Sequence, residues 1–202
     1  MASSVASPDK AASSIKPLMV YWSVGIIVGL LYLRADIFSV ASWSRPHVLS
    51  ILLTAAATAV TMVAYNSVTK TGGRSLHLPT FFGFSIANGI CETLLFIASF
   101  KIGVALAAPF TDSSLWLFLA GTLTFFAYLA VIHALFWLKI LPAHLDKRPA
   151  TKNARRVWVV SLTVMSVLWG WLYFGYQDFW SFAILHILFD AGMVYSIRYR
   201  LA

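Results

Sequence analysis

Long apolar runs alternate with short polar connections along almost the whole chain. Each run is close to the roughly 20 helical residues that cross a hydrocarbon core of about 30 Å. The runs lack the apolar and polar alternation of a barrel strand. Since backbone groups inside a bilayer must bond within their own segment, each run is predicted to be a helix. The predicted spans are 18–34, 47–66, 79–100, 115–140, 157–176 and 179–197.

Composition leads to the same class. Hydrophobic residues make up 60% of the chain, charged residues 11%, and the mean hydropathy is +0.80. An ordinary soluble domain carries roughly 25% charged residues. We therefore predict an all-α protein, an integral multi-pass bundle of six transmembrane helices. Residues 17–202 are expected to form one domain, because no linker is long enough to divide them, and residues 1–16 are expected to be a disordered tail.

The distribution of basic residues predicts an orientation. The formal net charge is +8, and with six spans and the N-terminus inside, all but three of the fifteen Lys and Arg residues lie in inside segments. This asymmetry follows the positive-inside rule, so both termini are predicted on the cytoplasm-like side. The basic loop 144–156 lacks interleaved aromatic residues. We interpret it as an orientation signal beside anionic lipid, and no nucleic-acid partner is expected.

Four ionisable residues lie inside the predicted spans: Glu92, which is the only glutamate, His133, His186 and Asp190. A buried carboxylate in a bilayer costs several kcal/mol unless something compensates it, so such residues are candidates for function. At about 1.5 Å per residue, the four lie roughly 12–21 Å from the inner ends of their helices. Three spans therefore bring them to similar depths, and we predict one pocket.

The neighbours of Glu92 extend this prediction. Ser85 and Asn88 share a helix face with Glu92 and are predicted to line the pocket, as is Cys91, a small packing residue rather than a nucleophile. His186 and Asp190 have the i, i+4 spacing that could ligate a metal or orient a water molecule. The sequence does not specify a cofactor.

A purely structural alternative remains open for each of these groups. A histidine in a helix can simply bond a carbonyl or hydroxyl group. Glu92 can be protonated and bond Asn88, which would hold neighbouring helices together. Asp190 can pair with His186 alone. In that case the polar residues stabilise the bundle without chemistry.

The order of these groups carries a resemblance to a known family. A glutamate in one span, a histidine in the next and "HILFD" (His186 to Asp190) in the last resemble the CPBP intramembrane proteases, also called Abi or CAAX prenyl protease type II. The similarity covers about residues 79–197. It implies that Glu92 activates water for attack on a peptide carbonyl. It further implies that His133, His186 and Asp190 position the water, stabilise the oxyanion or hold a metal, without deciding among these roles.

The motifs differ from the family pattern at several positions. Where the family has E-E-x-x-x-R, this chain has Cys91 and Thr93 beside Glu92, and Phe96 or Ile97 in place of the arginine. The histidine motif F-x-x-x-H has Leu129 in place of phenylalanine. This incomplete set favours a membrane scaffold, an accessory subunit or a ligand-binding protein, with other membrane proteins as partners.

Two alternatives are retained. The first is an active intramembrane peptidase that acts on a membrane-bound peptide or a prenylated protein through Glu92 and the histidines. The second is a tetrapyrrole-binding subunit, in which His133 and His186 are axial ligands. Both use the same predicted pocket, so the geometry of that pocket separates them.

Overall fold

The computed structural model describes residues 12–39, 41, 43–69, 71, 73–134 and 151–201. This part of the chain is almost entirely helical, and six of its helices are long and apolar enough to cross a membrane. They are α1 (Ile15–Tyr32), α3 (Arg45–Val68), α4 (Leu78–Ala107), α5 (Ser114–Ile132), α7 (Lys152–Tyr176) and α8 (Phe179–Ile197). The predicted all-α, six-span class is confirmed.

The observed boundaries differ from the predicted ones mainly at three places, one of which is the start of α7 at Lys152, where the predicted start is residue 157. Helix α4 continues seven residues beyond the predicted end at residue 100, and it therefore includes Lys101. The described part of the chain begins at β1 (Ala12–Ser13), within the predicted tail. Residues 1–11 of that tail, the last part of the predicted fourth span and most of the basic loop lie outside the described residues.

Local signals explain where several helices begin and end. The side chain of Ser44 accepts a hydrogen bond from the backbone of His47 at the start of α3, and Thr151 caps α7 in the same way. Asp178 accepts from the backbone N–H of Ser181 and so begins α8. These caps satisfy donors that the first helical turn cannot satisfy itself.

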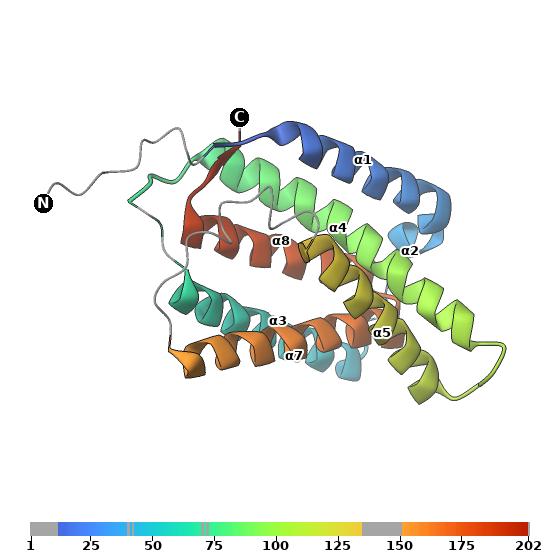
Figure 1. Ribbon diagram of the computed structural model, residues 1–202. Helices are drawn as coiled ribbons and strands as arrows, with labels where there is room; N and C mark the ends of the chain where they lie inside the picture. The colour runs from blue at the N-terminus through green and yellow to red at the C-terminus, as the bar shows by residue number, and fades with distance from the viewer. Residues whose placement is uncertain are drawn as a thin grey trace, which may run out of the picture.

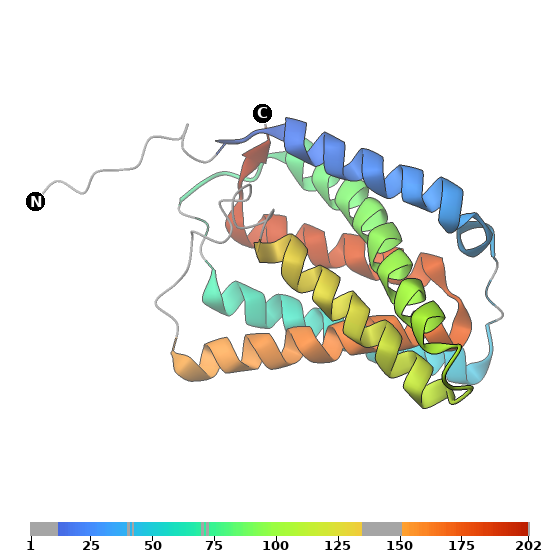
Figure 2. The same ribbon diagram turned by 45° about the vertical axis from the view of Figure 1, so that its right-hand side comes forward.

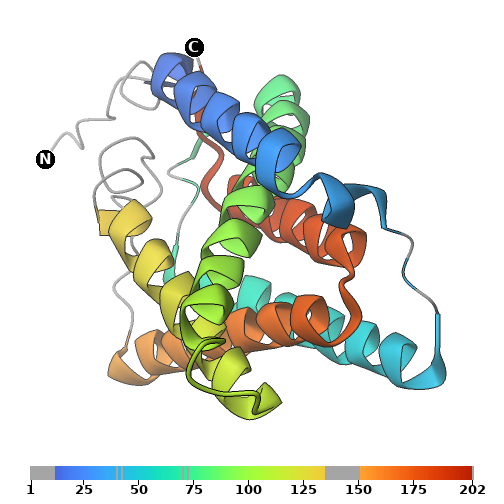
Figure 3. The same ribbon diagram turned by 90° about the vertical axis from the view of Figure 1, so that its right-hand side faces the viewer.

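The helices pack around α4 and α8, which occupy the middle of the bundle. Helix α1 lies along one side of α4, and the α3–α7 pair lies on the opposite side of α8 (Figures 1 and 3). Helix α5 crosses α4 and continues toward α7 (Figure 2). The outer faces carry exposed apolar side chains, as a bilayer requires. Examples are Leu31, Val63 and Leu123, each more than two-thirds exposed.

Glycines allow the close approach of several helix pairs. A Cβ atom at Gly25 of α1 would lie 2.7 Å from the carbonyl oxygen of Cys91 in α4. A Cβ atom at Gly89 of α4 would lie 2.8 Å from the backbone nitrogen of Ile187 in α8. Small residues at such contacts are typical of membrane helices, because they let backbones pack directly.

The two described ends of the chain lie side by side. Ala12 and Ser13 of β1 pair in parallel with Arg200 and Leu201 of β2 (Arg200–Leu201). Arg74, in the connection before α4, donates to the carbonyl oxygens of Ile197 (2.7 Å) and Arg198 (3.1 Å). This end of the bundle is therefore tied together by the backbone groups of β1 and β2 and by the side chain of Arg74.

An ion pair with a buried carboxylate ties the opposite end together. The short helix α2 (Arg34–Phe38) carries Asp36, which is 5% exposed, and Lys101 of α4 lies 2.7 Å from its Oδ2. The hydroxyl group of Tyr173 in α7 donates to Oδ1 of the same carboxylate. Asp36 thus connects the α1–α3 segment to two further helices.

We expect Asp36→Ala to lower the free energy of unfolding by about 2–3 kcal/mol, because it leaves the buried hydroxyl of Tyr173 and the partly exposed ammonium of Lys101 without their acceptor. Asp112→Ala, at an exposed position between α4 and α5, is the matched control and should change it little. Thermal unfolding of both variants in the same detergent tests this expectation. Equal transition temperatures would contradict it.

The orientation in the membrane stays a prediction, and single cysteines can test it. Cys91 is buried, so a new exposed cysteine gives the main labelling signal. Thr151→Cys should react with a membrane-impermeant thiol reagent only from the cytoplasm-like side, and Asp112→Cys only from the other side. Labelling of both positions from one face would refute the predicted topology.

Candidate functional site

Helix α4 supplies one wall of the site. Asn88 and Glu92 lie one helical turn apart, and Thr93 follows, so all three face α8. Glu92 is 4% exposed and Asn88 is 1% exposed. The close contact of Gly89 with Ile187 brings the two helices near enough for their short polar side chains to meet. The backbone packing therefore determines the width of the site.

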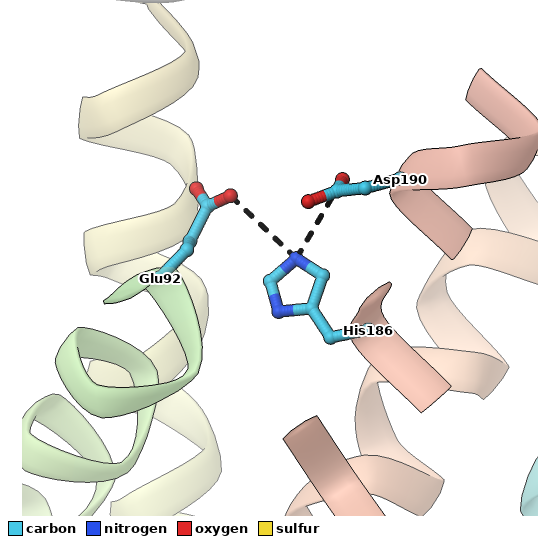
Figure 4. Close-up of side chains that lie close together, drawn as sticks. All are labelled: Glu92, His186 and Asp190. Atoms are coloured by element: carbon cyan, nitrogen blue, oxygen red, sulfur yellow. Dashed lines mark ion pairs between the residues drawn. The ribbon is translucent and has the colours of Figure 1, made fainter. Parts of the chain in front are cut away.

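Helix α8 supplies the opposite wall. His186 and Asp190 have the i, i+4 spacing, and both point toward Glu92 (Figure 4). Nε2 of His186 lies 3.5 Å from Oε2 of Glu92 and 3.9 Å from Oδ1 of Asp190. All three residues are buried. One imidazole nitrogen is thus flanked by two carboxylates inside the apolar bundle.

Asn88 holds the two carboxylates together. Its Nδ2 donates to Oε2 of Glu92 at 2.8 Å and to Oδ2 of Asp190 at 2.9 Å. Nε1 of Trp22 in α1 donates to the amide oxygen of Asn88 at 3.1 Å, which defines the orientation of that amide. The two acidic groups are therefore fixed by one amide that uses both of its donor hydrogens.

A pair of tyrosines supports the other oxygen of Glu92. The hydroxyl group of Tyr21 in α1 donates to Oε1 at 3.2 Å, and it also lies 3.0 Å from the hydroxyl group of Tyr128 in α5. Asn88 of α4, Tyr21 of α1 and His186 of α8 thus contact the Glu92 carboxylate. Donors on both oxygens stabilise its ionised form.

His186 is oriented by its surroundings. Its Nδ1 lies 3.0 Å from Oγ1 of Thr93. The ring of Phe96 stacks on the imidazole at a centroid distance of 5.3 Å and an angle of 5°, and Trp169 lies on the ring at 4.9 Å. These contacts leave Nε2 directed at the carboxylates. The two carboxylates flank Nε2, and the adjoining cavity of about 100 Å³ has no room for a tetrapyrrole macrocycle, which disfavours the tetrapyrrole alternative.

A cavity of about 100 Å³ lies beside this cluster, with room for several water molecules. Glu92, His133, His186 and Asp190 all line it, together with Asn88. His133, at the end of α5, donates from Nδ1 to the carbonyl oxygen of Leu129 at 2.8 Å. The structure thus brings the four ionisable residues of the sequence analysis onto one cavity.

Two other expected pocket residues lie elsewhere. Ser85 donates to the carbonyl oxygen of Phe81 in its own helix. Cys91 packs against Gly25 of α1, on another side of α4. Helix α4 is buried on most of its circumference in the described bundle, so a polar stripe along it does not by itself define one cavity.

Two unpartnered hydrogen-bond donors belong to residues on the cavity wall. Tyr65 of α3 is 6% exposed, and its hydroxyl group has no partner among the described residues. The same holds for Nε1 of Trp158 in α7. A buried donor without a partner costs about 1–3 kcal/mol, so a ligand or water that accepts from these groups is expected. Sequence patterns did not indicate either residue.

The cluster could also hold a metal ion. Glu92, His186 and Asp190 each offer one ligand atom, and these atoms lie within 4.8 Å of one another. The set differs from the expected His133, His186 and Asp190, since Glu92 takes the place of His133. His133 instead uses one ring nitrogen to bond its own helix.

Comparisons with known protein families, with curated proteins and with solved structures find no match for this chain. The resemblance to CPBP proteases consequently stays a prediction from the order of Glu92, His133 and the H-x-x-x-D motif. The geometry of the cavity is therefore the basis for assigning a function.

Proposed function

We propose that the protein is an intramembrane hydrolase in which Glu92 activates a water molecule for attack on a carbonyl group. The observation that carries this proposal is the convergence of Glu92, His133, His186 and Asp190, from three helices, on one cavity. Polar groups that only hold helices together need no more than pairwise hydrogen bonds. This site instead combines a hydrogen-bonded carboxylate, a histidine and space for water. The incomplete motif set therefore does not remove the central elements of the chemistry.

The proposed reaction uses the groups in sequence. Glu92 accepts a proton from a water molecule in the cavity, and the hydroxide oxygen bonds to the carbonyl carbon of the substrate. The tetrahedral intermediate then collapses, the C–N bond breaks, and the proton on Glu92 passes to the leaving amine. The net result is the addition of one water molecule across the bond.

The unpartnered donors have a role in this scheme. The hydroxyl group of Tyr65 and Nε1 of Trp158 can donate to the oxyanion that forms on the carbonyl oxygen. Asn88 and Tyr21 support the ionised form of Glu92 before the reaction, and Asp190 lies beside His186. Glu92 and the two unpartnered donors thus belong to residues that line the same cavity.

The expected substrate class is a peptide within or attached to the membrane, including a prenylated tail, because the site lies within the apolar bundle. The test is a cleavage assay with protein reconstituted in liposomes together with transmembrane and prenylated peptides. In heavy-oxygen water, hydrolysis should place one labelled oxygen in the new carboxyl terminus, as measured by mass spectrometry. Failure to release a labelled product from any peptide in the set would refute the proposal.

A second candidate is a ligand-binding accessory protein without catalysis. Phe96 favours it, because this residue stands at one of the two positions where the family pattern has arginine and it stacks on His186. A phenyl ring cannot supply the charge of a guanidinium group. This candidate predicts no labelled product in the liposome assay. It also predicts nearly unchanged stability on Glu92→Gln, since a protonated glutamate and a glutamine bond alike in a membrane interior.

A further inference from the structure

Glu92, His186 and Asp190 form a cluster whose negative charge the described protein groups compensate only in part. Two carboxylates face one imidazole nitrogen, and the described lining of the cavity contains neither lysine nor arginine. With both carboxylates ionised, the three groups carry a charge of −2 when His186 is neutral and −1 when it is protonated. A divalent cation would bring the charge to zero, which a low-dielectric interior strongly favours.

The distances fit such an ion. Zinc binds histidine nitrogen and carboxylate oxygen at about 2.0–2.2 Å, so tetrahedral ligands lie about 3.4 Å apart. Nε2 of His186 lies 3.5 Å from Oε2 of Glu92 and 3.9 Å from Oδ1 of Asp190. Figure 4 shows the three ligand groups directed at a common point from two helices. Small side-chain adjustments would complete a three-residue site, with the fourth position open to the cavity.

The residues behind the ligands are those that a metal site needs. A ligating histidine usually donates its other ring N–H to an oxygen, and a ligating carboxylate is usually hydrogen-bonded in turn. Thr93 lies at Nδ1 of His186, and Asn88 bonds both carboxylates. Tyr21 supports the second oxygen of Glu92. This outer layer orients all three ligands.

An independent observation also points to a ligand in the cavity. Tyr65 lines the same cavity, is more than nine-tenths buried, and has a hydroxyl group without a described partner. A water molecule on the fourth position of the ion would supply an acceptor and donor in this space. The acidic cluster and the unpartnered hydroxyl thus both indicate that this cavity binds a ligand.

We propose that Glu92, His186 and Asp190 bind one divalent transition-metal ion, with zinc as the best match to one nitrogen and two oxygen ligands. The inference goes beyond the proposed hydrolase, because the ion can bind whether or not a bond is cleaved. It is also compatible with the proposed role of Glu92. A carboxylate that binds through Oε2 keeps a lone pair on Oε1 for proton transfer.

The test is metal binding by the full chain in detergent, with any affinity tag removed. After treatment with a chelator and addition of Zn²⁺, elemental analysis should give close to one ion per chain. Addition of Co²⁺ in place of Zn²⁺ should give the visible absorption of a tetrahedral site. A stoichiometry near zero, together with no cobalt spectrum in the unaltered protein, would overturn the inference.

Variants locate the site. Asp190→Asn and His186→Gln should each abolish stoichiometric binding and the cobalt spectrum. The matched controls are Asp178→Asn and His47→Gln, which alter the other buried His–carboxylate pair, 2.8 Å apart at the start of α8. They should keep both signals. Loss of binding only in the control variants would also overturn the inference, and size-exclusion profiles establish that each variant is folded.

The outcomes distinguish this inference from the proposed function. Bound metal without any hydrolysis would support the metal site and contradict the hydrolase. Hydrolysis by a protein that binds no stoichiometric metal would support the hydrolase and contradict the metal site. Zinc should also raise the transition temperature of the unaltered protein, but not that of Asp190→Asn, because only the former binds it.

Discussion

Glu92→Gln should reduce the rate of peptide hydrolysis by about 100-fold to 10,000-fold and leave the protein folded. The amide keeps the size of the side chain but cannot accept a proton as a carboxylate does. Its oxygen can still accept from Nδ2 of Asn88. Its NH₂ group can donate to the hydroxyl oxygen of Tyr21, which in turn can donate to Tyr128.

The comparison needs a second buried carboxylate as a control. Asp178 is 6% exposed and bonds His47, but it lies at the N-terminal end of α8 and does not line the cavity. Asp178→Asn should keep the hydrolysis rate within a few-fold of the unaltered protein. Equal activity of the Glu92→Gln and unaltered proteins would rule out Glu92 as the base. Equal loss in both variants would point to a general effect on folding.

The helical framework could be predicted because it depends on local properties of the sequence. Length and apolar composition alone identify a membrane span, so all six runs correspond to helices in the described structure. Part of the site follows equally directly. The i, i+4 spacing puts His186 and Asp190 on one face, and similar depth brings Glu92 to their level.

The rest of the site depends on contacts between helices, which local patterns do not encode. Tyr21 and Trp22 lie in the first span, outside the region of family resemblance, yet they bond Glu92 and Asn88. They reach the site because Gly25 allows α1 to pack directly on α4. No periodicity in the first span distinguishes these two residues from their apolar neighbours.

The departures from the family motif acquire physical meaning only in the structure. Thr93 stands beside Glu92, where one alignment of the motif expects the second glutamate, and its hydroxyl group contacts His186. Phe96 covers a face of the same imidazole. A comparison of this sequence with the motif shows only that these positions lack the charged residues of the pattern. In three dimensions they are contacts that orient the histidine.

A substitution at the contact between α4 and α8 is expected to have the second large effect, a loss of stability. Gly89→Ala should lower the free energy of unfolding by about 1–3 kcal/mol or more, because the new methyl group cannot fit without moving a helix. Its Cβ would lie 2.8 Å from both N and Cα of Ile187. These are backbone atoms, so rotation of a flexible side chain cannot relieve the contact.

Gly83→Ala is the matched control in the same helix. A Cβ atom at Gly83 would have no neighbouring atom within 4 Å, so alanine should leave stability unchanged or raise it slightly through its greater helix propensity. Thermal unfolding of both variants in one detergent provides the measurement. Because Gly89 lies between Asn88 and Glu92 on the wall facing His186, its replacement should also widen the site and reduce hydrolysis and metal binding together. Equal stability of Gly89→Ala and Gly83→Ala would contradict the close approach of α4 and α8. It would also contradict the short distances among Glu92, His186 and Asp190, which depend on that approach.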